Sequence, residues 1–527
     1  MRFSKIKISK SQSLLIITLL LAVYYLVCGY VLNDMGYSNL ESLFYVEKVR
    51  IIFEGVGYKL KVIGLTAPII PFFATIAFTI INPLLAPVIA SCIGTAFLFY
   101  LIAGTLVRNL KDDFYLFLLL ALFLFHPGLV YTACSGKSIY MVLVFFYLFF
   151  FNLFRYYTSN TTFHISIASV CLVMLLFCDY KFIWLTLFFI PLIFSMAIHS
   201  LNLAEKESIF RMTMSFNNPS LRRKLINKTF ALYIILFILP IASVICYKLL
   251  NLTNANDVDY FLQSPYATWT VLADRLNYDL AAADPKAEVA EISLLVSAKA
   301  AMFCPLIIVM MFFFRDKLYQ ILTLFTPFAF VEFLHLKYEK TPIAYQYYLI
   351  FLVLAILCII IKGASIKQQF AFKIILGVVI TLQVFTGYYF LKNSASAEER
   401  KFIAAFIDKK ADENDDEQDE DKEMANYING LPEKSRVLLD DAVAYKIVAF
   451  TDNIGGLILP YQETYLGAVE TPRDYAEYIL VTTPKNLMSG YTLLSSKYPP
   501  LLYQATSNYA TLQKVHETPN WALYRFL

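Results

Sequence analysis

The sequence has little charge and lacks the short signatures of several enzyme classes. Charged residues make up only 16% of the 527 residues, whereas soluble domains carry about 25%. No GxGxxG, P-loop, GxSxG or HxxxH pattern occurs. These absences argue against a Rossmann dinucleotide site, a nucleotide-binding P-loop, a serine-hydrolase elbow and a zinc site.

Disulfides and nucleic acid are also excluded as organising features. The eight cysteines all lie in or beside apolar runs, and residues 392–527 contain none. This placement argues against a disulfide framework and against a CxxC metal site. Net charge is only +4, and the basic residues are scattered at the ends of apolar runs rather than gathered in one patch. No nucleic-acid partner is therefore expected.

What the chain has in abundance is long apolar runs. Hydrophobic residues make up 59% of the chain, and runs such as 14–31, 84–107 and 370–391 match the roughly 30 Å of a bilayer core at 1.5 Å per helical residue. We predict a polytopic α-helical membrane protein with about eleven spans. The predicted spans are near 12–33, 84–107, 113–131, 138–157, 162–178, 182–200, 229–250, 292–314, 318–336, 343–361 and 370–391.

Basic residues at the span ends predict the orientation. The first run follows a basic N-terminus and is too long for a signal peptide, so we interpret it as an uncleaved first span. If the proline-broken run 62–81 does not cross the membrane, the basic connections all fall on the side of the N-terminus. The positive-inside rule then predicts a cytoplasmic N-terminus and an external C-terminus. The composition is compatible with a bacterial inner membrane.

The chain divides into three parts. Residues 1–391 form the predicted membrane domain, with a long external loop at 34–83 that carries surface helices. Residues 392–424 form an acidic linker, which we expect to be a solvated tether because its charges repel one another. Residues 425–527 alternate strand and helix patterns and predict a small extracytoplasmic α/β domain. Its expected strands lie at 436–439, 457–460, 478–482, 510–515 and 521–526.

Three acids of the first external loop are candidates for a catalytic base. Asp34 ends the first span, and a carboxylate fixed at the membrane interface can take a proton or bind a cation. Glu41 and Glu47 lie in 39–54, where apolar residues have helical spacing. The ordinary explanation for these two glutamates is a surface helix with its acids in water.

Basic residues near the outer ends of the later spans are candidates for binding a phosphate. Lys299 lies inside the predicted span 292–314, where an ammonium group is costly unless it snorkels or is paired. His335, Lys337 and Lys340 cluster at the end of 318–336. The ordinary explanation for such residues is interfacial anchoring. Weaker candidates of the same kind are Lys181 and Arg275.

Together these features resemble the GT-C superfamily of membrane glycosyltransferases, especially the protein-mannosyltransferase and aminoarabinose-transferase type. The resemblance covers nearly the whole chain, in architecture more than in sharp motifs. It rests on the acid after the first span, on the long first loop and on the external α/β domain. The quoted sequence features are Ala67–Pro71, Leu106–Arg108, His126–Gly128, Ser135–Ser138, Tyr478–Val481 and Trp521–Arg525.

The resemblance implies inverting transfer of a sugar from a polyprenyl-phosphate donor, on the non-cytoplasmic face, to a lipid, glycan or protein acceptor. Asp34 takes the position of the family's catalytic acid, with Glu41 and Glu47 as alternatives. The donor-phosphate ligands that it implies are Lys299, His335, Lys337, Lys340, Lys181 and Arg275.

The first loop departs from the family pattern in two ways. It has no adjacent acidic pair, and Pro-Ile-Ile-Pro replaces the usual Pro-Pro-Leu. A hard cation prefers several oxygen ligands, so no tightly bound metal is expected, although Mg²⁺ or Mn²⁺ is left open. Two other functions stay open: a transporter or flippase of lipid-linked or polysaccharide intermediates, and a non-catalytic membrane assembly protein.

Overall fold

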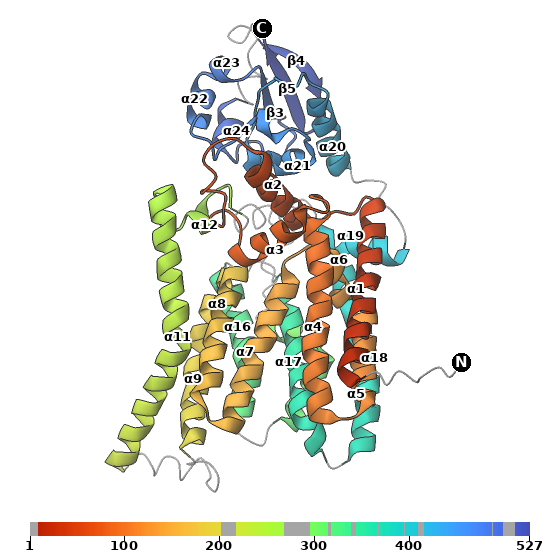
Figure 1. Cartoon of the computed structure of the whole chain (residues 1–527), viewed down its shortest axis with the longest axis vertical. Coiled ribbons are helices and arrows are strands. Elements are labelled where there is room, and N and C mark those ends of the chain that lie inside the picture. The colour runs from red at the N-terminus through yellow and green to blue at the C-terminus, as the bar shows by residue number, and fades with distance from the viewer. Residues whose placement is uncertain are drawn as a thin grey trace, which may run out of the picture.

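A bundle of apolar helices forms the larger part of the molecule, and a small sheet with its helices stands at one end of it (Figure 1). The computed structural model describes residues 9–201, 218–267, 296–314, 318–338, 344–366, 368–394, 396–408, 416–486, 488–498 and 512–527. Seven helical segments in these ranges are long and apolar enough to cross a membrane. They are α1 (Lys10–Asp34), α4 (Ala86–Leu110), α7 (Ile139–Ser159), η1 with α9 (Tyr180–Ser200), α11 (Pro219–Ala255), α17 with η2 (Gln346–Ser365) and α18 (Gln369–Lys392).

The eighth candidate is a bent pair, α5 (Asp113–Phe125) and α6 (Pro127–Cys134), which meet at 62°. Pro127 takes the first helical position of α6, where its missing N–H costs nothing. The predicted membrane protein is thus confirmed, but length and composition support fewer than eleven spans. Shorter or interrupted helices occupy the other predicted positions: α8 (Thr162–Cys178), α14 (Val296–Phe303), α15 (Pro305–Phe313) and α16 (Leu318–Lys337).

Within the apolar run 62–81, the helix is too short to cross a bilayer. The helix in this run is α3 (Ile69–Thr79), which starts after Pro68 and has 11 residues. That corresponds to a length of about 16 Å. It packs against α2 (Leu40–Glu54), α4 and α8. The prediction of the orientation depends on this segment staying on one side.

The C-terminal residues form one five-stranded sheet in the order β2-β1-β3-β5-β4. Strands β1 (Val437–Leu438), β2 (Leu457–Ile458) and β3 (Tyr478–Thr482) are parallel. A hairpin of β4 (Leu512–Glu517) and β5 (Trp521–Phe526) adds to β3 in antiparallel fashion. The predicted small α/β sheet is therefore present. The helices around the sheet are α21 (Asp441–Phe450), η4 (Ile454–Gly456), α22 (Tyr465–Glu470), α23 (Pro472–Tyr475) and α24 (Leu493–Lys497).

Much of the segment 392–424, expected to be a solvated tether, is helical and packed. Helix α19 (Ala397–Ile403) and the π-helical turn η3 (Ala404–Asp408) bury Phe402 against the helical bundle. Helix α20 (Asp416–Asn429) packs on α21. The Asp421 carboxylate accepts from Trp521 Nε1 at 2.7 Å and pairs with Lys446 at 3.1 Å. Acids that find such partners need not be solvated.

Helix α2 lies between the helical bundle and the C-terminal sheet domain (Figure 1). It is buried along most of its length, unlike the expected surface helix with its acids in water. Phe44 packs against Tyr445 of α21, and Arg50 Nη1 donates to the carbonyl of Ala449 at 2.9 Å. Ile51 and Val62 belong to the core of the C-terminal domain itself. Helix α2 of the first loop is therefore packed as part of the C-terminal domain.

The remaining described helix is α12 (Tyr260–Gln263), which follows α11.

Candidate functional site

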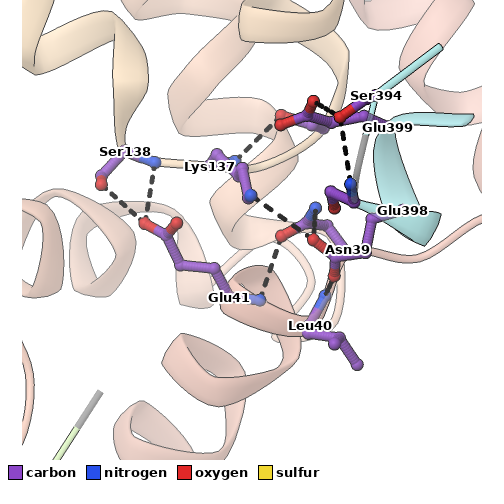
Figure 2. A network of polar contacts seen from close by, with 10 residues as sticks. Asn39, Leu40, Glu41, Lys137, Ser138, Ser394, Glu398 and Glu399 are labelled. Carbon is purple, nitrogen blue, oxygen red and sulfur yellow. Dashed lines mark hydrogen bonds and ion pairs between the residues drawn. The ribbon is translucent and has the colours of Figure 1, made fainter. Parts of the chain in front are cut away.

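A network of polar side chains surrounds the start of α2, as Figure 2 shows. Asn39 caps the helix: its Oδ1 accepts from the Glu41 amide at 3.0 Å, and its Nδ2 donates to Glu398 Oε2 at 3.0 Å. The other oxygen of Glu398 accepts from the Leu40 amide at 2.6 Å. A carboxylate at a helix N-terminus is favourable because it meets the exposed amides and the positive end of the dipole. Residue Glu398 of α19 thus fixes where α2 begins.

The turn between α6 and α7 holds the Glu41 side chain. Gly136 has φ +74°, a backbone conformation that glycine adopts without strain. This lets the chain reverse so that Ser138 donates to Glu41 Oε1 from its hydroxyl at 2.6 Å and from its amide at 3.2 Å. The carboxylate of Glu41 is therefore held at the end of the helical bundle that faces the C-terminal domain. It is half-buried, and its other oxygen accepts no hydrogen bond from a described residue.

Lys137 is the cation of this network. Its Nζ lies 3.4 Å from Glu398 Oε2 and 5.9 Å from the centre of the Tyr131 ring. Burial lowers the pKa of Lys137, but the nearby carboxylates of Glu398, Glu41 and Glu399 outweigh burial and raise it above its ordinary value. Burial raises the pKa of Glu399, although Lys137 and the Ser394 hydroxyl oppose the rise. The Lys137 side chain is therefore protonated and positively charged near neutral pH.

A second charged cluster joins α2 to α21. Lys48 Nζ lies 2.8 Å from Asp441 Oδ2 and 3.2 Å from Glu47, and all three side chains are at most 3% exposed. Burial raises the pKa of Glu47, and Asp441 raises it further against the pull of Lys48. Beside them, burial raises the pKa of Asp440 to about 7. This cluster is closed to solvent, so Glu47 has no access to a substrate.

Two of the predicted phosphate ligands share one basic and aromatic cluster. Lys337 Nζ lies 4.3 Å from the Trp184 ring centre, and Lys181 Nζ lies 5.0 Å from that of Tyr338. Trp184 Nε1 donates to the Tyr338 hydroxyl at 3.4 Å. Ammonium groups held over ring faces keep donors for an anion, because the ring does not neutralise them.

Asp179, next to Lys181, is occupied elsewhere. Its buried carboxylate accepts from Gln346 Nε2 at 2.7 Å and from the Tyr347 hydroxyl. The Lys181 amide, rather than its ammonium group, bonds to Asp179 Oδ1 at 3.0 Å. The Lys181 ammonium group therefore forms no ion pair with Asp179.

The other predicted site residues that the structure describes lie on three different helices. Lys299 is exposed on α14, and His335 is buried on α16. Asp34 is the exposed last residue of α1, and no hydrogen bond or ion pair joins it to another described residue. Lys340 and Arg275 lie outside the described residues. Within the described ranges, no three His, Cys, Asp or Glu side chains are grouped to hold a metal ion.

Sequence reasoning missed several members of both clusters. No local sequence pattern identified four of them as site residues: Lys48, Asp441, Glu398 and Glu399. Their partners lie hundreds of positions away in the chain. The turn Ser135–Ser138 was singled out only for its resemblance to a family pattern. Its glycine next to Lys-Ser was the available sign of a tight turn that presents polar groups.

No protein-family model matches the chain, and no curated protein matches its sequence.

Proposed function

We propose that this protein is a glycosyltransferase of the GT-C type, which moves a sugar from a polyprenyl-phosphate donor to an acceptor outside the cytoplasm with inversion. The observation that carries the proposal is the placement of Glu41, a carboxylate of the first external loop. Two hydrogen bonds from Ser138 hold it at the end of the bundle next to the C-terminal domain. That is where a lipid-borne donor and an acceptor from outside can meet.

In this reaction Glu41 acts as the general base. The acceptor hydroxyl or amine attacks the anomeric carbon, its proton passes to Glu41, and the bond between the anomeric carbon and the phosphate oxygen breaks. The polyprenyl phosphate leaves with the electron pair of that bond. A positioned base typically contributes a factor of about 10²–10⁴, and holding its orientation lowers the entropic cost of attack.

Lys181 and Lys337 are the described cations that suit the leaving phosphate. Both lie near Trp184 and Tyr338, whose amphipathic rings are typical of the interface where lipid headgroups lie. Neutralising the charge that develops on the leaving oxygen is the larger part of such catalysis. Lys299, His335, Lys340 and Arg275 remain further candidates for the same role.

Among the three first-loop acids, the contacts favour Glu41 as the base. Glu47 is fully buried and paired with Lys48. Asp34 is reachable but no described neighbour orients it, so it is the second choice. Glu41 is both partly reachable and oriented.

The test is sugar release or transfer from a panel of polyprenyl-phosphate sugars by the protein in nanodiscs, with native membrane extract as acceptor. We expect Glu41→Gln to lower turnover by at least about 100-fold, while Glu47→Gln and Asp34→Asn retain it. Loss in Asp34→Asn alone would move the base to Asp34. Silence of the unaltered protein across the panel, with extract present, would reject the transferase in favour of a transporter or an assembly protein.

A further inference from the structure

A cavity of about 340 Å³ lies where the outer ends of α1, α4 and α6 meet the start of α2. Residues of α20 and α21 close it from the side of the C-terminal domain. Its size is at the lower end of the range of small-molecule sites, about 300–1,000 Å³. It therefore suits a small molecule or the end of a larger one.

Three polar side chains on three different helices line this cavity and make no side-chain hydrogen bond to any described residue. Ser42 of α2 is only 4% exposed, yet its hydroxyl makes no hydrogen bond to any described residue. The side-chain amides of Asn33 on α1 and Asn426 on α20 are exposed, and they make no hydrogen bond to another described residue. The Ser42 oxygen is not one of the described polar atoms that are closed off without a partner, so it is open to the cavity and can bond to an occupant there.

The lining has the chemistry of a carbohydrate site. Hydroxyl and amide groups both donate and accept hydrogen bonds, as sugar hydroxyls do. Tyr37 and Phe450 add aromatic rings, and Lys422, which lies 5.5 Å from the Phe450 ring centre, adds donors. No carboxylate is among the described lining residues, which disfavours a cation as the occupant.

The proposed base, Glu41, is not itself among the described lining residues, but residues beside it line the cavity. Ser42 follows Glu41 in α2, and Ser135, which lines the cavity, belongs to the turn whose Ser138 bonds to Glu41. We propose that this cavity binds the acceptor and that the acceptor is a carbohydrate, whose terminal sugar offers its hydroxyl toward Glu41. This inference rests on the proposed function, but binding can be measured without turnover.

The experiment is saturation-transfer NMR on the full chain in nanodiscs, with oligosaccharides released from the cell envelope of the source organism. Ser42→Ala and Asn426→Ala each remove one hydrogen-bonding group. We expect each to weaken binding about fivefold to tenfold. The matched control is Asn254→Ala, a half-buried asparagine at the C-terminal end of α11 whose side chain bonds only within its own helical turn. It should bind as the unaltered protein does.

Absence of oligosaccharide binding, or binding that ignores both variants, would overturn the inference. So would glycerophosphoryl headgroups that bind in place of sugars with the same sensitivity to Ser42→Ala. Thermal unfolding of each variant checks that it folds. Donor hydrolysis without acceptor is measured in parallel, so donor turnover without sugar binding rejects only the carbohydrate acceptor. Sugar binding without donor turnover in the presence of extract rejects only the transferase.

Discussion

At the residue scale, the surroundings of each acidic side chain depend on partners that lie far away in the sequence. Glu41 and Glu47 are six positions apart on one helix, yet one faces a half-buried turn and the other a closed ion cluster. Asp34, the most conspicuous acid in the sequence, has no such partner among the described residues. Two predictions belong to this scale.

Ser138 is a positioning residue for Glu41. Ser138→Ala removes the 2.6 Å hydrogen bond from the hydroxyl while keeping the bond from the backbone amide. We expect kcat to fall about tenfold, the scale of one charge-assisted hydrogen bond, with KM little changed. Ser138→Thr, which keeps the hydroxyl, should recover most of the activity.

The control is Ser159→Ala at the opposite end of α7, where the hydroxyl bonds to the carbonyl of Arg155. It should leave both constants unchanged. An equal fall in kcat for Ser138→Ala and Ser138→Thr would argue against the positioning role.

We expect Asp440 to make the stability of the C-terminal domain depend on pH. Burial raises its pKa from 3.8 to about 7, so the folded state holds a proton that the unfolded state releases. The contribution of Asp440 to the free energy of unfolding is fully present below about pH 4, and it is lost as the pH rises to about 7. Between pH 5 and pH 8 the free energy of unfolding should fall by roughly 2–3 kcal/mol, at about 1.4 kcal/mol per pKa unit.

Thermal unfolding at the two pH values measures this change. Asp440→Asn should remove most of the slope while keeping the cap on the Ala442 amide, because asparagine caps helices as well as aspartate does. An unchanged slope in the variant would assign the effect to another group, such as Glu47.

At the scale of elements, the contact between α2 and α21 holds the C-terminal domain on the membrane domain. Apolar residues on both helices meet there, and Lys48 bridges Glu47 and Asp441 inside it. Because Glu41 is on the same helix, the position of the proposed base depends on this contact.

Lys48→Met should break this contact from within. It leaves two carboxylates buried without a cation, which typically costs about 3–5 kcal/mol. We expect a lower unfolding temperature and faster proteolysis between the helical bundle and the C-terminal domain. Adding Glu47→Gln and Asp441→Asn should restore most of the loss, because neutral side chains need no counter-ion there.

The matched control is Lys497→Met, which removes the partner of the largely exposed Glu470. Exposed ion pairs contribute about 0–1 kcal/mol, so the control should unfold like the unaltered protein. Equal effects of the two substitutions would mean that the buried cluster adds nothing to the contact.

At the scale of the whole molecule, the orientation in the membrane is the property that the function needs. The start of α11 and the C-terminal domain lie at opposite ends of the helical bundle (Figure 1). The basic residues 222–224 near the start of α11 predict that this end is cytoplasmic. The C-terminal domain is then outside.

Membrane-impermeant maleimide tests this orientation in intact cells or spheroplasts. In a Cys246→Ser background, which removes the one exposed cysteine, we expect Ser496→Cys to be labelled and Ser220→Cys to be labelled only after permeabilisation. Both positions are exposed. The reverse pattern would place Glu41 and the cavity in the cytoplasm and would contradict the proposed use of an external donor.

The sequence by itself determined the membrane class and the C-terminal sheet. Long runs without charge must be helical in a bilayer because backbone groups there have no water to bond to. Likewise, the short apolar runs at 478–482 and 521–526, rich in aromatic and branched residues, suffice for strands of a small sheet. These features arise from local sequence and length, which are visible without any partner.

Tertiary structure alone decided which acids matter and where the linker is ordered. The Glu47 side chain was expected in water but is enclosed by Lys48 and Asp441. The acidic segment 416–424 begins a packed helix because Trp521 and Lys446 contact Asp421. The Glu41 carboxylate accepts a hydrogen bond from Ser138, which lies in a turn 97 positions away in the chain. Hydrogen bonds and ion pairs of this kind join distant segments, so their partners leave no trace in local spacing, and only the folded chain brings them together.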